Sequence, residues 1–315
     1  MSVDSRADTP GNYIILQLVS DSKIRPSLNP TLVNFLKHSK FTLFETRSAF
    51  QAGLVVTCKP SSISSRASVK ISQSQLEWAA PTANDDGSNR VVGGTDAKVD
   101  EFPYIASLRI SSDSHICAGS ILNSRTIVTA AHCVDGNTPE DLSVVVGSIY
   151  LNSGGTKYQI SKITIHPDYN ADTDDNDIAV IITSEAITTS SSVGFISLPT
   201  DSTGAGVEVT LSGWGTTSLN GEIPNILQKI TLLTLSEEDC KEKLPPDFPP
   251  TLDTNICTLT KAGEGACHGD SGGPLADGNV LVGVVNRGVP CAKGNPDVFA
   301  RVSSFVSWIN ENTQT

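Results

Sequence analysis

From residue 91 onward, apolar residues come in short runs that are separated by turn-forming residues. Clear examples are ASLRI, LSVVVGSIYL, DIAVIIT, NVLVGVVN and VFARV, with Gly, Asn, Asp, Ser and Pro between them. Runs that are rich in β-branched residues and bounded by turn residues predict strands. Many such strands at close spacing, joined by Gly-rich turns, predict an all-β barrel or sandwich.

The last residues show a different pattern. In SSFVSWINEN, the side chains of Phe305, Trp308 and Ile309 recur at helical spacing behind a serine that can cap a helix. This pattern predicts a C-terminal α-helix. No apolar run approaches the roughly 18 residues that a membrane helix needs, so we expect no contact with a membrane.

Residues 1–90 differ in texture from the rest of the chain. They contain the Ser-rich stretch SSISSRASVKISQSQ and end in PTANDDGSNR, which is typical of an exposed linker. We therefore divide the chain into a poorly ordered N-terminal extension, 1–90, and a folded domain, 91–315. Asp4 and Asp8 precede the first apolar patch, which is wrong for a secretory signal. A long pro-region and a gene-model artefact both stay open as explanations of the extension.

Charge is divided unevenly between these two parts. Residues 1–90 carry ten basic and seven acidic side chains, whereas residues 91–315 carry twelve basic and 27 acidic ones. A domain this acidic is a poor partner for nucleic acid, whose phosphates need neutralising. We therefore expect no nucleic-acid partner.

The chain has seven cysteines, and six of them lie in the folded domain. No CxxC pair occurs, which argues against a zinc site. An even number of cysteines indicates disulfides, and disulfides imply an oxidising compartment, so we expect secretion. Cys58, in the extension, is left over.

One glycine-rich stretch, GEGACHGDSGGPL, surrounds a single serine, Ser271. A serine hydroxyl is a weak nucleophile that needs a base, and the base needs a third group to hold its tautomer. The sequence offers His132 within TAAHCV as the base and Asp177 within DDNDIAVI as the group that orients it. The backbone N–H groups of Gly269 and Ser271 can serve as an oxyanion hole.

Four motifs, in order, carry a resemblance to a known family: VVGG after Arg90, then TAAHC, NDIAV and GDSGGP. With them, residues 91–315 resemble the trypsin/chymotrypsin family of serine proteases. The stretches KAGEGACHGDSGGPLADG and NPDVFARVSSFVSWIN look especially like those of chymotrypsins from ants and related insects.

The resemblance implies the following fold and activity. The fold would be all-β, with two six-stranded antiparallel barrels, the triad between them and a C-terminal helix. His132, Asp177 and Ser271 would cleave polypeptides through an acyl-enzyme, without a cofactor. We expect a monomer that protein protease inhibitors recognise. The loop GSIYLNSGGTKY lacks the acidic residues of the family's calcium site, so we expect no metal.

The same resemblance implies the disulfides and the route of activation. The pairs would be Cys117 with Cys133, Cys240 with Cys257 and Cys267 with Cys291. A trypsin-like protease would cut after Arg90, and the new amine of Val91 would then pair with Asp270.

The residues that match the family's substrate pocket are Gly265, His268, Asn286, Arg287, Gly288 and Asp297. A neutral, small Gly265 at the pocket floor favours large apolar or aromatic side chains before the cut bond. Asn286 and Arg287 depart from the family's usual Ser and aromatic residue. Asn286 would donate to the triad carboxylate in place of the Ser hydroxyl, and Arg287 would attract acidic or aromatic groups upstream of the cut bond.

Three outcomes stay open for Asp297, which stands where trypsins and vertebrate chymotrypsins carry Gly, although the combination of Gly265 with Asp297 resembles that of insect chymotrypsins. Its carboxylate would attract basic side chains, giving trypsin-like or broad specificity, or stay protonated, or turn toward an internal partner. A non-catalytic protease-like protein is the rival function from another class, supported only by the departures at Asn286 and Arg287.

Overall fold

The computed structural model describes residues 91–289 and 291–313, together with the backbone of four earlier strands. The chain divides into two compact units, 1–86 and 87–315. In the first unit the four strands form an antiparallel sheet in the order β1-β2-β4-β3. Their bounds are Val3–Asp4 (β1), Leu16–Val19 (β2), Phe41–Ser48 (β3) and Gln51–Cys58 (β4). The expected poor order of the rest of the extension, and the state of the Cys58 thiol, lie outside the described residues.

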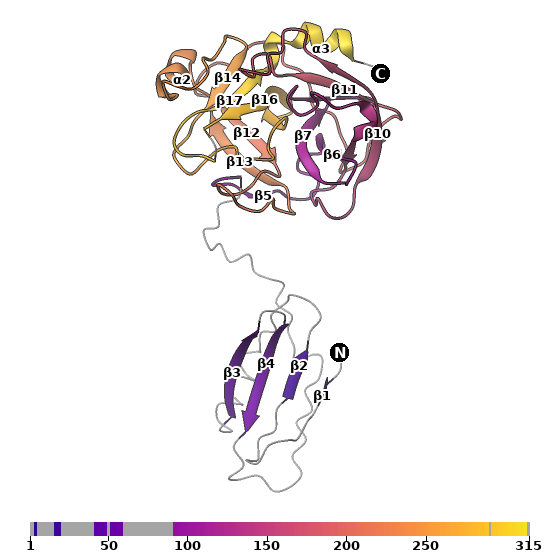
Figure 1. The fold of residues 1–315 in the computed structure, drawn as a ribbon, viewed down its shortest axis with the longest axis vertical. Helices are drawn as coiled ribbons and strands as arrows, with labels where there is room; N and C mark the ends of the chain where they lie inside the picture. Colours follow the sequence, from indigo (N-terminus) through magenta and orange to yellow (C-terminus); the bar gives the residue numbers. More distant parts are fainter. Residues whose placement is uncertain are drawn as a thin grey trace. The chain divides into compact units, whose positions relative to one another are not determined.

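Six strands of the second unit close into an antiparallel barrel in the order β10-β11-β8-β7-β6-β9 (Figure 1). Runs such as LSVVV and AVIIT are buried along their whole length, which explains why they are mostly apolar rather than apolar at alternate positions only. The bounds are Ile105–Ile110 (β6), His115–Ile121 (β7), Thr126–Thr129 (β8), Leu142–Val146 (β9), Thr156–Ile165 (β10) and Ala179–Thr183 (β11). A 3-10 turn, Pro139–Asp141 (η2), leads into β9.

The remaining strands form a second sheet in the order β14-β17-β16-β15-β12-β13-β5. Its two long edges meet, because Thr234 bridges Thr258 and the Leu235 N–H donates to the Cys257 carbonyl at 2.9 Å. Six strands therefore wrap into the second predicted barrel, and short β5 adds to the edge of β13. The bounds are Thr95–Asp96 (β5), Glu208–Gly213 (β12), Gln228–Leu233 (β13), Asn255–Thr258 (β14), Pro274–Asp277 (β15), Val280–Gly288 (β16) and Asp297–Arg301 (β17).

The predicted C-terminal helix is present as α3, Val306–Asn312, which packs on the first barrel (Figure 1). Phe305 and Ile309 are buried in a core cluster that includes residues of both barrels, and Trp308 packs against it, as the spacing predicted. The helix begins one residue later than expected. The N-cap is Phe305 rather than a serine, because the preceding Val302–Ser304 segment forms a 3-10 turn (η3).

The other α-helix of the second unit is α2, Glu237–Lys243. It begins at Ser236, whose side chain accepts a hydrogen bond from the Asp239 N–H at 3.0 Å. Three acidic residues in its first turn and two lysines in its last also complement the helix dipole. Within the described residues, no helix is long and apolar enough to cross a membrane.

The three expected disulfides are present. Cys117–Cys133 joins β7 to the segment after β8, Cys240–Cys257 joins α2 to β14, and Cys267–Cys291 joins the loop before β15 to the loop before β17. Their Cα–Cα distances are 6.1, 6.0 and 4.4 Å. Each cross-link stabilises the fold by about 2–4 kcal/mol.

Candidate active site

His132 and Asp177 meet because β8 and β11 are antiparallel neighbours. Thr129, at the end of β8, pairs with Ala179, at the start of β11. The residues that follow β8 and those that precede β11 therefore lie at the same end of the first barrel. His132 is in the first of these segments and Asp177 in the second.

Asp177 uses both carboxylate oxygens on His132. Oδ2 accepts from Nδ1 of the ring at 2.7 Å, and Oδ1 accepts from the backbone N–H of His132 at 2.8 Å. Asp177 is fully buried, whereas the His132 side chain is 28% exposed. The carboxylate thus fixes the orientation of the ring and its tautomer, with the proton on Nδ1 and a basic Nε2.

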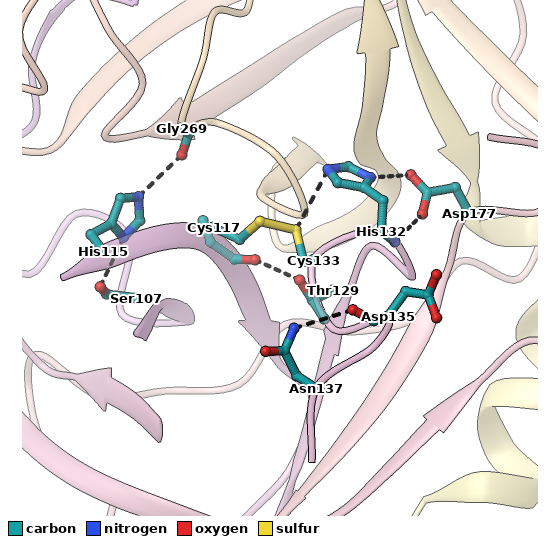
Figure 2. Close-up of a disulfide and its surroundings, with 11 residues drawn as sticks. Ser107, His115, Cys117, Thr129, His132, Cys133, Asp135, Asn137, Asp177 and Gly269 are labelled. Carbon is teal, nitrogen blue, oxygen red and sulfur yellow. Dashed lines mark hydrogen bonds and ion pairs between the residues drawn. A yellow bond between two sulfur atoms is a disulfide. The ribbon is translucent and has the colours of Figure 1, made fainter. Parts of the chain in front are cut away.

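The charge state of His132 is set by opposing effects. Burial disfavours the imidazolium, but the hydrogen bond and charge of Asp177 and the charge of Asp174 outweigh it, so the pKa of His132 lies above its usual value. Figure 2 shows the ring between Asp177 and the Cys117–Cys133 disulfide, with Nε2 at 3.7 Å from Cys133 Sγ. Nε2 is the atom that is placed to exchange a proton.

The loop that carries Ser271 is attached to both barrels. The Ala118 N–H of β7 donates to the Ser271 carbonyl at 2.8 Å, and the Gly272 N–H donates to the Val285 carbonyl of β16 at 2.9 Å. Gly272 has a φ of +72°, and a Cβ there would lie 2.2 Å from Thr129 Oγ1. Only glycine fits this contact with the strand that leads into His132.

Ser271 is half-buried at this junction. Among the described residues, no hydrogen bond joins the Ser271 hydroxyl to His132 Nε2 in this chain, whose bond after Arg90 is intact. Nucleophile and base often lie apart before substrate binds. The structure therefore brings the Ser271 loop to the His132 segment without forming the bond between the two side chains.

The backbone around Gly269 is oriented by groups that the sequence did not reveal. His115 Nε2 bonds the Gly269 carbonyl at 3.1 Å (Figure 2). The Thr216 N–H donates to the His268 carbonyl at 2.7 Å, so both peptide planes at Gly269 are fixed. The N–H groups of Gly269 and Ser271 donate to none of the described residues. These two N–H groups are therefore free to bind an oxyanion.

His115 is itself half-buried. Its Nδ1 bonds Ser107 Oγ at 2.9 Å and its ring packs edge-on to Trp214 at 5.5 Å. Burial lowers the pKa of His115 to about 4, despite the bond to the Gly269 carbonyl. In the sequence His115 had no catalytic match, and only its position two residues before Cys117 hinted at a place near the site.

Asp270 is fully buried and is bound by backbone groups. Oδ1 accepts from the Gly215 N–H at 2.8 Å and Oδ2 from the Cys267 N–H at 3.0 Å. A Cβ on Gly213 or on Gly215 would lie 2.1 or 2.2 Å from a carboxylate oxygen, so glycines make room for this group. Burial raises the pKa of Asp270 to about 6, although both hydrogen bonds oppose the rise.

Asp297 lies directly against Gly265. A Cβ on Gly265 would be 2.3 Å from Asp297 Oδ2, and one on Gly288 would be 3.0 Å from Oδ1. Oδ2 accepts from the Ala266 N–H at 2.7 Å. Of the three outcomes left open by the sequence, the structure gives an internal partner together with burial, and burial raises the pKa of Asp297 to about 7. His268, in contrast, is exposed.

Asn286 and Arg287 are directed differently from the expectation. The Asn286 amide donates to the Asp174 carbonyl at 2.9 Å rather than to Asp177. The Arg287 side chain is only 8% exposed and donates to the carbonyls of Asp174 and Pro250. Arg287 is therefore not a free charge on the surface, because neighbouring loops already use its guanidinium.

One group of described residues has the spacing of metal ligands, namely Cys117, His132 and Cys133. Its two sulfurs are bonded to each other, and Nδ1 of His132 is bonded to Asp177. Both sulfurs are therefore held in the disulfide and Nδ1 carries the proton that Asp177 accepts, and we assign no metal centre here.

A model of the family named Trypsin matches residues 91–309. The chain belongs to the trypsin family. Chymotrypsin-2 of Vespa crabro is 44% identical over 223 residues, which cover 70% of this chain and 99% of that protein. Trypsin delta of Drosophila erecta is 41% identical over 225 residues, 71% of this chain and 88% of that protein. Trypsin alpha-4 of Lucilia cuprina is 42% identical over 221 residues, 70% of this chain and 86% of that protein.

Membership of the trypsin family makes the chain a serine endopeptidase, a hydrolase that acts on polypeptides. The relatives carry the names of both chymotrypsins and trypsins at similar identity. The choice between apolar and basic side chains at the cut bond therefore depends on the pocket of this chain.

Proposed function

We propose that residues 91–315 form a chymotrypsin-like endopeptidase that cleaves after large apolar or aromatic residues and is made as a zymogen activated by cleavage after Arg90. The observation that supports the catalytic assignment is the pair of hydrogen bonds from His132 to Asp177, beside the loop that carries Ser271. Residues 1–90 would be the extension removed or displaced on activation.

In the reaction, the Ser271 oxygen attacks the carbonyl carbon before the cut bond while His132 Nε2 takes the hydroxyl proton. The N–H groups of Gly269 and Ser271 bind the resulting oxyanion. When the intermediate collapses, the carbon–nitrogen bond breaks and the proton passes from Nε2 to the leaving amine. Water then attacks the acyl-enzyme by the same route, which releases the acid and restores Ser271.

The pocket supports an apolar preference with a pH-dependent component. Gly265 leaves the floor without a side chain, and the buried Asp297 carboxyl next to it is neutral at low pH. A neutral floor suits an aromatic side chain, which buries about 150–250 Å². Trypsin-like or broad specificity through ionised Asp297 is the alternative.

We further propose secretion, because three disulfides need an oxidising compartment to form. The partners would be polypeptide substrates, a trypsin-like activating protease and protein inhibitors, and digestion would be the role. The non-catalytic reading is weakened because His132, Asp177 and Ser271 are all retained.

Labelling tests the catalytic assignment directly. We expect a fluorophosphonate to modify Ser271, and no other residue, in protein cut after Arg90, because only a serine with an adjacent base and an oxyanion site is that nucleophilic. Peptide mass mapping of the labelled protein locates the site, and Ser120, a buried serine of β7, is the internal control. Label on a different residue, or none at all in the cut protein, would refute the assignment.

A second experiment tests the pocket. Because the pKa of Asp297 is about 7, its charge appears as pH rises from about 6 to about 8, and acceptance of Arg should rise with it. We expect the kcat/KM ratio of an Arg substrate to a Phe substrate to increase by about tenfold over this range. The ratio cancels the common effect of His132 ionisation.

Asp297→Asn is the matched control for this change, because it keeps the shape of the side chain and cannot ionise. In that variant the ratio should stay flat with pH. A wild-type ratio that is equally flat would show that ionised Asp297 does not reach the substrate.

A further inference from the structure

Two consecutive side chains of β16 converge on one carbonyl in the loop between β10 and β11. Asn286 Nδ2 donates to the Asp174 carbonyl at 2.9 Å and Arg287 Nη1 donates to the same oxygen at 2.7 Å. Consecutive residues of a regular strand point to opposite faces. The register of β16 on β17 slips between Val285 and Arg287, so a bulge at Asn286 lets both side chains reach the same loop.

Arg287 also holds a second loop. Its Nη2 donates to the Pro250 carbonyl, in the loop between α2 and β14, at 3.1 Å and lies 3.6 Å from Asp175 Oδ1. The guanidinium carbon lies 5.9 Å from the centre of the Phe248 ring. One buried cation therefore fastens a loop of the first barrel to a loop of the second.

The loop that receives these bonds is internally braced and ends at Asp177. The Asn170 N–H donates to the Asp175 carbonyl at 3.0 Å, and the Asn176 side chain donates to the Asp168 carbonyl at 3.0 Å. Asp174 and Asn176 both have φ of +51°, the left-handed conformation that Asp and Asn adopt more readily than other non-glycine residues. Because the bonds within the loop hold its shape, we expect a shift at Asp174 to reach Asp177, three residues later.

We propose that Asn286 and Arg287 are positioning residues, which act through the Asp174 carbonyl to hold the carboxylate of Asp177 on His132. This proposal rests on the proposed function of the site. The pair replaces a direct bond from β16 to the triad carboxylate with a clamp on the loop that carries it. This arrangement costs stability, because Asn286 Oδ1 and Arg287 Nε are buried without a hydrogen-bond partner.

The clamp also controls charge near the base. The negative charges that act on His132 are those of Asp177 and Asp174. Asp174 in turn faces the carboxylates of Asp177 and Asp175, which raise its pKa, and the cationic groups of His132 and Arg287, which lower it. If the loop is released, both carboxylates move from His132 and its pKa falls. Loss of the Arg287 charge by itself favours the imidazolium and opposes this fall, so Asn286→Leu, which removes no charge, isolates the effect of the loop.

The test uses Arg287→Met and Asn286→Leu in the full chain after cleavage at Arg90. With a substrate of one acylated residue, too short to reach Arg287, we expect kcat to fall by about tenfold to a hundredfold and KM to change little. The acid limb of kcat should move to lower pH in Asn286→Leu, and by less in Arg287→Met, where the lost charge opposes the shift. Because the two side chains share one acceptor, the double variant should lose less than the product of the single losses.

Two further variants separate positioning from stability. Arg301→Met removes a partly buried arginine of β17 that also donates to backbone carbonyls, of Thr203, Asp253 and Asn255, none of which belongs to the Asp174 loop. It should lower Tm to a similar degree while kcat and the pH profile stay as in the wild type. Arg287→Lys, which keeps one donor and the charge, should recover part of the lost kcat.

A readout that needs no turnover decides the proposal even for an inactive protein. The His132 ring is titrated by NMR, and we expect its pKa to be lower, and its Nδ1 proton signal broader, in Arg287→Met and Asn286→Leu than in wild type. An unchanged titration in Asn286→Leu, with losses confined to KM for long peptides, would overturn the proposal and make Arg287 a substrate contact. A wild-type protein that neither labels nor turns over would refute the proposed function instead.

Discussion

Asp177→Asn should lower kcat of the cleaved enzyme by about 10⁴-fold, which is the loss that the same change causes in a serine protease with this triad. Asp177 accepts two hydrogen bonds from His132, one at Nδ1 and one at the backbone N–H. An asparagine has a single acceptor oxygen, so its NH₂ group must face one of these donors. If it faces the ring, Nδ1 becomes an acceptor, the proton moves to Nε2, and the base is lost.

Asp172→Asn provides the matched control, because Asp172 lies exposed in the same loop. We expect that variant to keep the wild-type kcat, and both variants to keep the wild-type fold as judged by circular dichroism. Steady-state kinetics on a short aromatic substrate measure the effect. A loss of less than tenfold in Asp177→Asn would mean that another group orients His132.

The fold of the protease domain could be predicted well because its signals are local. The runs LSVVV and AVIIT predict buried strands, and the spacing of Phe305 and Ile309 predicts the buried face of the last helix. The reactive residues could be proposed for the same reason, since each lies in a short motif beside a strand end. That His132 lies beside Asp177 depends on the pairing of β8 with β11, and the motifs alone do not specify which strands pair.

Side-chain direction was harder to predict than position. Asn286 was expected to donate to Asp177, but the bulge in β16 turns its amide to the Asp174 carbonyl. A bulge depends on the register of two strands, and register is a property of the pair rather than of either segment. Arg287 was read as a free charge for the same reason, because its acceptors come from two loops that are distant in sequence.

Two buried carboxylates beside the site, Asp270 and Asp297, are accommodated in the same way. Asp270 fits against Gly213 and Gly215, and Asp297 fits against Gly265, so each occupies space that a Cβ would fill. Backbone N–H groups bind both, and burial raises the pKa of Asp270 to about 6 and that of Asp297 to about 7. Gly265, at the proposed pocket floor, therefore has no side chain because the Asp297 carboxyl, distant in sequence, fills that space.

The loop that binds both carboxylates also contacts the start of the folded domain. The Gly265 N–H donates to the Val92 carbonyl at 3.0 Å, and Cys267, two residues further on, donates to Asp270. Val91 is fully buried and has a φ of +32°, which is unfavourable for a β-branched residue. In the uncut chain, no ion pair among the described residues involves Asp270.

Cleavage after Arg90 should therefore raise kcat/KM by about 10²- to 10³-fold, and an Arg90→Gln chain treated with trypsin should stay at the uncut level. A free Val91 amine gives the buried Asp270 carboxylate a cation, and a buried pair that loses one partner costs about 3–5 kcal/mol. Arg66→Gln, another arginine of the extension, is the control and should activate normally. Equal activity of cut and uncut protein on a short aromatic substrate would refute the zymogen proposal.

The pH dependence of the activated form gives an independent check on the same ion pair. Pairing raises the pKa of the Val91 amine above the roughly 7.7–8.0 of a free α-amine and lowers that of Asp270 below about 6. The stabilisation is complete below the pKa of the free amine and disappears as pH rises through the raised value. Activity should therefore fall on the alkaline side, and this limb should be absent from the residual activity of the Arg90→Gln chain, which has no Val91 amine to lose its proton.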